Sequence, residues 1–429
     1  MSGAPSDASV ADTLNELLRR TYLSAPSDLA AVIAEQARPL GAHDVVLYLI
    51  DYEQRTLVPL GDPPRGDLRP LSVEGTIAGR AFRTTSVVHS SADGGKGERL
   101  WLPLLDGTER LGVIWMAFDH EPLTERTAMV CERYAHLTAM LIATKAAYGD
   151  TFEVSRRRQP MTIASELLWQ LAPPLVFATD RLVLAAMLEP CYDIGGDALD
   201  YAVNDGVLHV GVFDAMGHGL AAAGVAAFAL SAYRHSRRRG YGLLETYASM
   251  DAAVRDQFPG DRYVTAVIAQ LHLETGRLTW VSAGHPPPLV IRDARLTRTL
   301  SAPPAAPLGI PLEGPPAELA EESLEPGDLL LLYTDGLTEA RQRNGEMFTL
   351  HGLGEFVERE AAAGQTAPET LRRLRQAIVE RQAGELKDDA TAVLVEWRRG
   401  SEADLLPPTA RSPAIVGDAG AGATAPAAR

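Results

Sequence analysis

The sequence predicts an α+β protein with two folded domains joined by a helical segment. Its 429 residues exceed the usual length of one domain, and roughly 100–200 residues per domain give two or three. Strand-like apolar runs are flanked by helical segments in the first third, and in the second half they are joined by tight turns. Tight turns favour antiparallel sheets with helices on their outer faces.

The first domain is expected over residues 25–148, after a flexible N-terminal segment (1–24) that includes a short helix. Asp106-Gly107 lies between two strand-like runs and suits a hairpin turn, because glycine tolerates positive φ. A crossover rich in Pro and Gly occupies residues 61–97. The expected helices are 14–22 and 28–39, and the expected strands are 44–51, 100–105 and 111–118.

The last helix of this domain carries a heptad-like series. Its members are Val130, Tyr134, Leu137, Leu141, Thr144 and Tyr148. Thr144 interrupts the apolar character, and the series is shorter than the three or four heptads that define a coiled coil. We therefore expect the helix to pack on its own sheet, and pairing of two chains through part of the series stays open.

A helical linker is expected over residues 149–178. It begins with a charged segment (153–159) and continues as a helix (162–171) that ends at Pro173-Pro174, because proline disfavours helix in the residue before it. A helix between two domains can carry a signal from one to the other. A passive spacer is the alternative.

The second domain is expected over residues 179–398 and the tail, 399–429, is expected to be disordered. Asn204-Asp205-Gly206 is a strong hairpin signal between two apolar runs. The tail is rich in Ala, Pro and Gly and has no periodicity. The expected strands are 182–187, 199–203, 207–213, 265–273, 278–282, 288–292, 296–300, 329–333 and 391–397, and the expected helices are 220–237, 243–257 and 368–383.

Composition excludes several classes of function. The formal charge of 40 − 56 = −16 argues against binding to nucleic acid or to anionic membranes, which requires clustered Lys and Arg. Two cysteines, Cys131 and Cys191, cannot build a disulfide framework and suit a reducing compartment. The longest apolar stretch (219–233) is shorter than the roughly 20 residues of a spanning helix. The N-terminus does not resemble a secretory signal, so we expect a cytoplasmic protein.

Four aspartates stand where expected strands end. They are Asp197, Asp214, Asp335 and Asp388, and the first three have a neighbouring or nearby glycine. Oxygen-only clusters suit hard cations such as Mg²⁺ or Mn²⁺, and carboxylates crowded without a cation raise one another's pKa. An aspartate beside glycine is more often a turn residue, and spacing alone does not place these four side chains at one site.

Six motifs occur in the second half in a fixed order: EPCYDIGGDALDY, VFDAMGHGLAAA, RYVTAVIAQL, SAGHPPPLV, LEPGDLLLLYTDGLTEAR and KDDATAVLV. Together they resemble the SpoIIE/RsbU-type branch of the PP2C (PPM) serine/threonine phosphatases. The resemblance implies an α-β-β-α sandwich with two mostly antiparallel sheets and a centre of two Mn²⁺ or Mg²⁺ ions. It assigns as catalytic and metal-binding residues Asp197, Asp214, Asp335 and Asp388, with the backbone carbonyl of Ala215 as a further ligand. A metal-bridging water would attack phosphorus without a phosphoenzyme.

Other residues of these motifs receive weaker interpretations. The resemblance does not transfer a general-acid role to His218, which more simply shapes the turn before a helix, and His285 reads as a loop histidine. Asp389 is expected to support a neighbouring ligand through hydrogen bonds. The chain has Ala198-Leu199 where the family usually has an aromatic pair, a change that removes no ligand.

The first domain resembles a GAF domain over about residues 28–148. The segments that carry this resemblance are HDVVLYLID, LSVEGTIAGRAF, LWLPLL and LGVIWMAF. GAF domains bind small ligands, bind proteins or dimerise, so a small ligand is one expectation. Haem ligation by His43 or His89 is less favoured than an ordinary role for either histidine.

The expected function is removal of phosphate from Ser or Thr of a partner protein under control of the GAF-like domain. The resemblance implies a STAS-type anti-sigma-factor antagonist as the partner, and a homodimer stays open. The alternative is a ligand-sensing GAF module joined to a catalytically silent phosphatase-like scaffold. A metal-dependent nuclease fits the aspartates but not the acidic charge.

Overall fold

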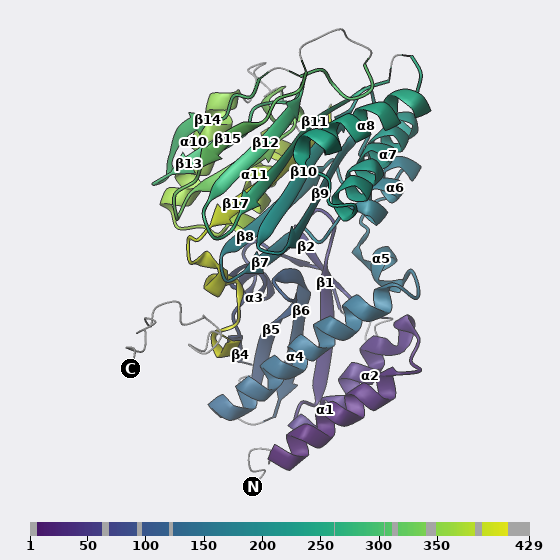
Figure 1. Cartoon of the computed structure of the whole chain (residues 1–429). Helices are drawn as coiled ribbons and strands as arrows, with labels where there is room; N and C mark the ends of the chain where they lie inside the picture. Colours follow the sequence, from purple (N-terminus) through teal and green to yellow (C-terminus); the bar gives the residue numbers. More distant parts are fainter. Residues whose placement is uncertain are drawn as a thin grey trace, which may run out of the picture.

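The computed structural model describes residues 7–61, 68–91, 97–119, 123–260, 262–303, 305–310, 316–339, 349–381 and 388–410. The chain forms two domains that lie one against the other, the N-terminal domain below and the C-terminal domain above in Figure 1. Three sheets and the helices around them confirm the α+β class. Within the described part of the chain, no helix is long and apolar enough to cross a bilayer.

The N-terminal domain is built on a six-stranded sheet in the order β3-β2-β1-β6-β5-β4, with every pairing antiparallel. Its strands are β1 (Asp44–Ile50), β2 (Thr56–Pro59), β3 (Leu71–Ser72), β4 (Val88–Ser91), β5 (Glu98–Asp106) and β6 (Glu109–Phe118). The helices are α1 (Asp7–Thr21), α2 (Leu29–Gln36), α3 (Ile77–Thr84) and α4 (Glu125–Ala146), with two 3₁₀ turns at Pro26–Asp28 and Arg38–Leu40. The turns bracket α2 where one continuous helix was expected over 28–39.

Strand β1 is buried on both faces, which explains its unbroken apolar sequence. Val45, Leu47 and Leu49 pack in the cluster that includes α1, α2 and α4, whereas the intervening residues pack in the cluster that includes α3. Alternate side chains of a strand point to opposite faces, so helices cover both sides of the sheet.

The heptad-like series of α4 divides between two surroundings. Val130 and Tyr134 are buried against the sheet, and the Tyr134 hydroxyl donates a hydrogen bond to the Ile33 carbonyl at 2.7 Å. Thr144, near the end of α4, and Tyr148, two residues beyond it, are exposed. The first half of the series therefore packs on its own domain, as expected.

The linker contains α5 (Thr151–Arg156) and α6 (Ile163–Leu171). Thr162 caps α6, its hydroxyl accepting the Ser165 N–H at 3.2 Å. Strand β7 (Val176–Thr179) follows and pairs with β8. The second domain's sheet thus begins slightly before residue 179.

The C-terminal domain contains two antiparallel sheets, in the orders β15-β12-β11-β10-β9 and β14-β13-β16-β17-β8-β7. The first has β9 (Asp197–Asn204), β10 (Val207–Ala215), β11 (Val264–His272), β12 (Arg277–Ala283) and β15 (Ala320–Ser323). The second adds β8 (Leu182–Glu189), β13 (Leu289–Arg292), β14 (Arg295–Thr299), β16 (Leu329–Tyr333) and β17 (Ala390–Trp397). The helices are α7 (Gly219–Arg238), α8 (Leu243–Gln257), α9 (Gly336–Glu339), α10 (Leu350–Ala362) and α11 (Ala367–Arg381).

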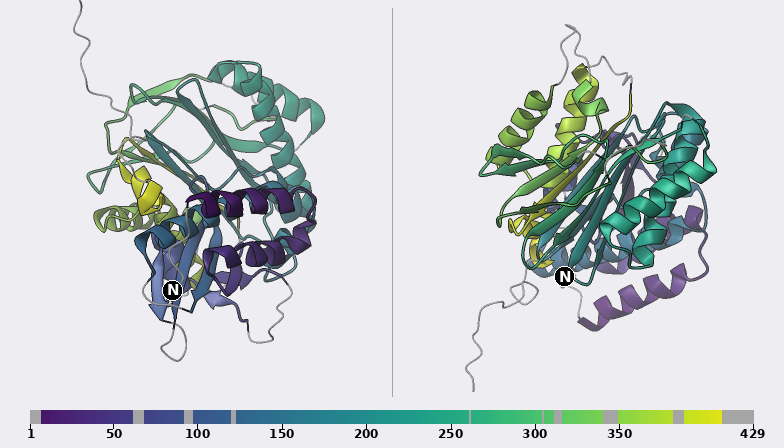
Figure 2. Two further views of the ribbon diagram at one scale, coloured as in Figure 1. Left: turned by 90° about the horizontal axis from the view of Figure 1, so that it is seen from below. Right: turned by 45° about the horizontal axis from the view of Figure 1, so that its top comes forward.

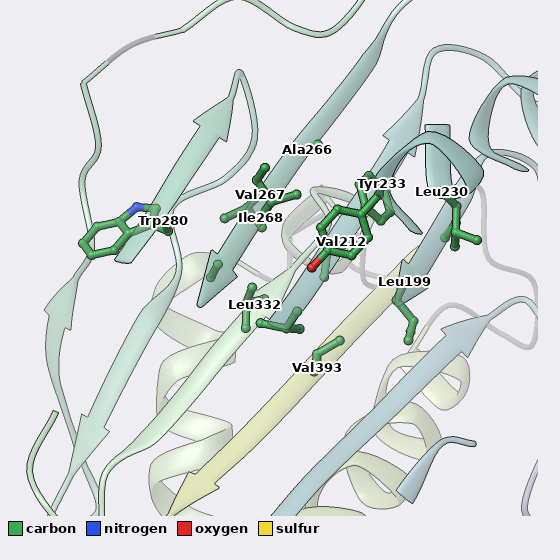
Figure 3. Close-up of a cluster of buried hydrophobic side chains, with 14 of the residues drawn as sticks. Leu199, Val212, Leu230, Tyr233, Ala266, Val267, Ile268, Trp280, Leu332 and Val393 are labelled. Atoms are coloured by element: carbon green, nitrogen blue, oxygen red, sulfur yellow. The ribbon is translucent and has the colours of Figure 1, made fainter. Parts of the chain in front are cut away.

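The two sheets face each other, and helices cover their outer faces. Leu184 and Leu188 of β8 pack toward the first sheet, whereas Val183 and Met187 pack in the cluster beneath α10 and α11. Figure 2 shows α7 and α8 in teal on one side of the sheets and α10 and α11 in yellow-green on the other. Figure 3 shows Val393 of the second sheet among side chains of the first. The layers are therefore α-β-β-α.

Several elements differ from the expectations. The elements that were not predicted are strands β2, β3, β4, β7 and β15 and helices α3, α5, α9 and α10. The disorder predicted for the tail is wrong for residues 401–410, which form the 3₁₀ helices Ser401–Leu405 and Pro408–Ala410. Leu405 is buried among side chains of the C-terminal domain, and the Thr85 hydroxyl donates a hydrogen bond to the Asp404 carbonyl at 2.9 Å. The rest of the predicted tail, 411–429, lies outside the described residues.

The turn after β1 joins the two domains. The Tyr52 ring lies edge-on to Trp169 of α6, with ring centroids 4.9 Å apart. The Tyr52 carbonyl accepts hydrogen bonds from Cys191 Sγ and from Arg375 Nη1, each at 3.2 Å. Arg375 of α11 also forms a buried ion pair with Glu189. The N-terminal domain thus contacts the segment that leads into β9.

Candidate active site

Two of the predicted aspartates face each other across neighbouring strands. Asp197 begins β9 and Asp214 lies near the end of β10, and the antiparallel register places them directly opposite. The turn at Asp205-Gly206 fixes that register, since both residues have positive φ (48° and 77°), as a two-residue hairpin turn requires. The hairpin therefore delivers two carboxylates to one end of the first sheet.

The other two predicted aspartates come from the second sheet. Asp335 follows β16 and Asp388 precedes β17, and these two strands are antiparallel neighbours. Both side chains are exposed. The charges of Asp335 and Asp388 act on Asp214, so the ends of both sheets contribute acidic groups to one rim of the sandwich.

A buried threonine joins the two sheets at this rim. The Thr334 hydroxyl donates to Asp197 Oδ2 at 2.7 Å and accepts the Thr391 N–H at 2.9 Å. All three residues are buried. The hydroxyl's donor and one of its acceptor positions are both used, so Thr334 holds the Asp197 carboxyl against the second sheet.

Asp389 holds the backbone that leads into β9. Its carboxylate accepts hydrogen bonds from the N–H groups of Gly195, Gly196 and Asp197, with distances of 2.7 Å from Gly195 and 3.1 Å from Asp197. A carboxylate that accepts several backbone N–H groups is fixed in orientation. Asp389 therefore positions Asp197 through the main chain.

The carbonyl of Ala215 approaches this same backbone closely. Ala215 N–H donates to the Gly196 carbonyl at 3.1 Å, and a Cβ added at Gly196 would lie 2.5 Å from the Ala215 oxygen. Only glycine allows that approach. The carbonyl thus lies beside the segment that carries Asp197.

The site raises the pKa of its own carboxyls. Burial and the charges of Asp335, Asp388 and Asp389 raise the pKa of Asp214 to about 7. Burial, followed by the charges of Asp389 and Asp214, raises the pKa of Asp197 well above its usual value. Each shift reflects negative groups crowded away from water.

The donor set suits hard divalent cations, because the gathered groups are carboxylates and one carbonyl. Neighbouring positive charge would relieve the repulsion that raises the pKa of Asp214. As the side chains stand, no three acidic, imidazole or thiol groups among the described residues are close enough to form a ready metal cage. Binding would therefore draw the carboxylates closer together.

The two histidines of the motifs have different surroundings. His218 is exposed at the N-cap of α7, and its side chain makes no capping hydrogen bond. His285 is buried, and its Nδ1 lies 2.8 Å from the Thr265 hydroxyl. Sequence reasoning missed the contacts of Thr334, Thr265 and His285, since each joins segments distant in the chain. Thr334 precedes Asp335 in the sequence, and Thr265 lies opposite Asp214. Their positions in the motifs TDG and RYVT were the sequence signal that could have indicated these contacts.

Comparison with known proteins finds a family model and curated relatives that match this chain. The Stage II sporulation protein E (SpoIIE) family matches residues 204–398, a range that includes Asp214, Ala215, Asp335 and Asp388 and begins after Asp197. Phosphoserine phosphatase RsbU of Bacillus subtilis is 20% identical over 288 residues, which cover 65% of this chain and 85% of RsbU. Phosphoserine phosphatase RsbP of the same organism is 24% identical over 174 residues, 39% of this chain and 42% of RsbP.

Solved structures of similar proteins cover about half of the chain. The SiaA-PP2C domain of Pseudomonas aeruginosa has a TM-score of 0.47 and 20% identity, covering 55% of this chain and 94% of that domain. The RsbU and RsbW domains of a Mycobacterium tuberculosis protein give 0.45 and 26%, covering 54% of this chain and 64% of that one. The family match and the two curated relatives thus show a SpoIIE-type domain in the C-terminal part of this chain, similar to phosphoserine phosphatases.

Proposed function

We propose that this protein removes phosphate from serine or threonine of a partner protein in a reaction that depends on two Mn²⁺ or Mg²⁺ ions. The observation that carries the proposal is the opposition of Asp197 and Asp214 across β9 and β10, at the rim where Asp335 and Asp388 also act on Asp214. Crowded acidic groups whose pKa values are raised in this way are typical of functional sites.

The proposed metal ligands are Asp197, Asp214, Asp335, Asp388 and the carbonyl of Ala215. When bound, the two ions supply a nucleophilic hydroxide near neutral pH and stabilise charge on the phosphoryl oxygens. The chain's own residues hold these ligands in place. Thr334 orients the Asp197 side chain, and the β9–β10 register keeps Asp214 opposite Asp197.

We propose a STAS-type anti-sigma-factor antagonist as the phosphorylated partner. Similarity to RsbU and RsbP, both named phosphoserine phosphatases, supports phosphoserine in a protein as the substrate. The two buried, unpaired cysteines Cys131 and Cys191 support a reducing, cytoplasmic setting.

We propose that the N-terminal domain is GAF-like and regulates the phosphatase, with a small ligand as one input. The contacts of Tyr52 with Cys191 and Arg375 support a physical connection, because Cys191 lies six residues before Asp197. The exposed end of the α4 series, Thr144 and Tyr148, supports a homodimer through that face, which light scattering of the full chain tests.

Hydrolysis of a generic aryl phosphate and of candidate phosphorylated STAS proteins, each with Mn²⁺, tests the proposed function. Asp214→Asn and Asp335→Asn are expected to lower the rate at least about 100-fold, because each removes a charged ligand. Asp205→Asn is the matched control, since Asp205 lies in the hairpin turn with positive φ, where asparagine is equally suited.

Two outcomes contradict the proposal. Wild-type protein that hydrolyses no phosphoester with Mn²⁺ present would favour the silent scaffold. Equal rates in wild type, Asp214→Asn and Asp335→Asn would exclude the proposed metal ligands.

A further inference from the structure

Asp214 is held from β11 as well as from β9. The β10–β11 register places Thr265 directly opposite Asp214, and the Thr265 hydroxyl is close enough to the Asp214 carboxyl to lower its pKa. The same hydroxyl lies 2.8 Å from Nδ1 of His285. Three neighbouring polar side chains therefore stand in a row from His285 through Thr265 to Asp214.

The number of hydrogens sets the direction of this chain. When a bound cation keeps Asp214 ionised, its carboxylate only accepts hydrogen bonds, so the Thr265 hydroxyl would direct its one hydrogen toward Asp214. In that cation-bound state the Thr265 oxygen would accept from His285, with the imidazole proton on Nδ1. Valine in place of Thr265 could neither accept nor donate a hydrogen bond, whereas serine could do both.

His285 is suited to stay neutral in this position. It is 6% exposed, and burial lowers its pKa to about 3. The Tyr333 backbone opposes that shift, and Nε2 of His285 has no hydrogen-bond partner among the described residues. The hydrogen bond to Thr265 is therefore the side chain's polar contact within that part of the chain.

The loop that carries His285 is itself fixed. The Ser282 hydroxyl donates to the His285 carbonyl at 3.1 Å. Gly284 has a φ of +67°, and a Cβ there would lie 2.8 Å from Pro307. The imidazole thus stands on a rigid turn between β12 and β13, and not on a mobile surface loop.

We propose that His285, acting through Thr265, is a positioning residue that fixes the Asp214 carboxylate for cation binding. This inference rests on the proposed metal site. Partners behind a metal ligand orient it, and their loss typically weakens metal affinity about 10–100-fold. If Thr265 holds one oxygen of the Asp214 carboxylate, the other oxygen stays available for a cation at the rim where Asp335 and Asp388 lie.

Calorimetric titration of the full chain with Mn²⁺, in the absence of substrate, tests the inference. We expect His285→Leu and Thr265→Val each to weaken Mn²⁺ binding about 10–100-fold. His285→Asn retains an N–H near the position of Nδ1, and Thr265→Ser retains the hydroxyl, so both are expected to stay within about threefold of wild type. The double variant Thr265→Val/His285→Leu is expected to bind no more weakly than the weaker single variant, because both changes break one chain.

The outcomes separate this inference from the proposed function. If His285→Leu lowers the melting temperature but leaves Mn²⁺ affinity unchanged, His285 is only structural and the inference is overturned. Additive losses in the double variant overturn it as well. If wild-type protein binds no Mn²⁺, the proposed metal site fails and the inference fails with it. Thr265→Val, which preserves side-chain shape, gives the same answer should His285→Leu not fold.

Discussion

Replacing Thr334 with valine should destabilise the C-terminal domain by breaking the bridge between its sheets. Valine preserves the shape of threonine but removes the hydroxyl that donates to Asp197 at 2.7 Å and accepts from the Thr391 amide at 2.9 Å. No cavity forms, so the effect isolates the two hydrogen bonds. The Thr391 amide, buried in a residue with no exposed surface, is left without that acceptor.

The magnitude follows from these two losses. A lost hydrogen bond costs about 0.5–1.5 kcal/mol, and an orphaned buried amide about 1–3 kcal/mol. Burial raises the pKa of Asp197, so we take the value for a neutral partner in the metal-free protein. Together they give about 2–4 kcal/mol, which lowers the melting temperature of a domain of this size by roughly 5–15 °C.

Differential scanning calorimetry of the full chain with EDTA measures this shift. Thr334→Ser is the matched control, since it keeps the hydroxyl and loses one methyl group, a cost of about 1 kcal/mol. A valine variant that melts within about 2 °C of the serine variant would show that the hydroxyl bridge does not stabilise the domain.

Gly196→Ala places a Cβ 2.5 Å from the carbonyl oxygen proposed as a ligand, and we expect about 10-fold weaker Mn²⁺ binding by calorimetry. Gly224→Ala is the control, because a Cβ at that position meets nothing within 4 Å. Equal Mn²⁺ affinities of the two variants would contradict the reasoning. Arg375→Met leaves Glu189 buried without its cation, and we expect the free energy of unfolding in urea to fall by about 3–5 kcal/mol. Adding Glu189→Gln should recover part of this loss. A double variant as unstable as Arg375→Met would contradict the pairing. Burial raises the pKa of Glu132, so its ionisation costs stability as pH rises above about 4. Glu132→Gln should therefore exceed wild type in thermal stability at pH 8 but not at pH 4, and equal differences at both would refute this.

Local sequence signals were sufficient for half of the site. The hairpin signal at Asp205-Gly206 pairs Asn204 with Val207, and counting seven residues outward in each strand places Asp197 opposite Asp214. Turn chemistry thus sets the register of the first two carboxylates. Asp335 and Asp388 belong to the second sheet, and their approach to Asp214 depends on how the two sheets pack.

Contacts between distant segments could not be predicted from the sequence. Thr334 and Asp197 are 137 residues apart in the chain, and Thr265 and His285 are 20 apart. A threonine beside an aspartate in the sequence looks the same whether its hydroxyl links two sheets or only sits in a turn. Family resemblance named the proposed ligands, but the side chains that contact them emerge only from the packed structure.

The missed elements have weak local signals for physical reasons. Strand β15, with the sequence AEES, is a short edge strand and mostly solvent-facing. The segment 401–410 is held by contacts with residues far away, such as Thr85. Tertiary contacts order these segments, and their own sequences do not.

The contact of Tyr52 with Cys191 and Trp169 bears on how the protein can be dissected. A truncation that begins at Thr162 would leave Trp169 and Cys191 without the ring and carbonyl that cover them. The same cut would open the buried Arg375–Glu189 pair to water. A changed rate in such a fragment would mix loss of regulation with a freshly wetted surface. Single substitutions of Tyr52 in the intact chain are therefore a cleaner test of the proposed regulation by the N-terminal domain.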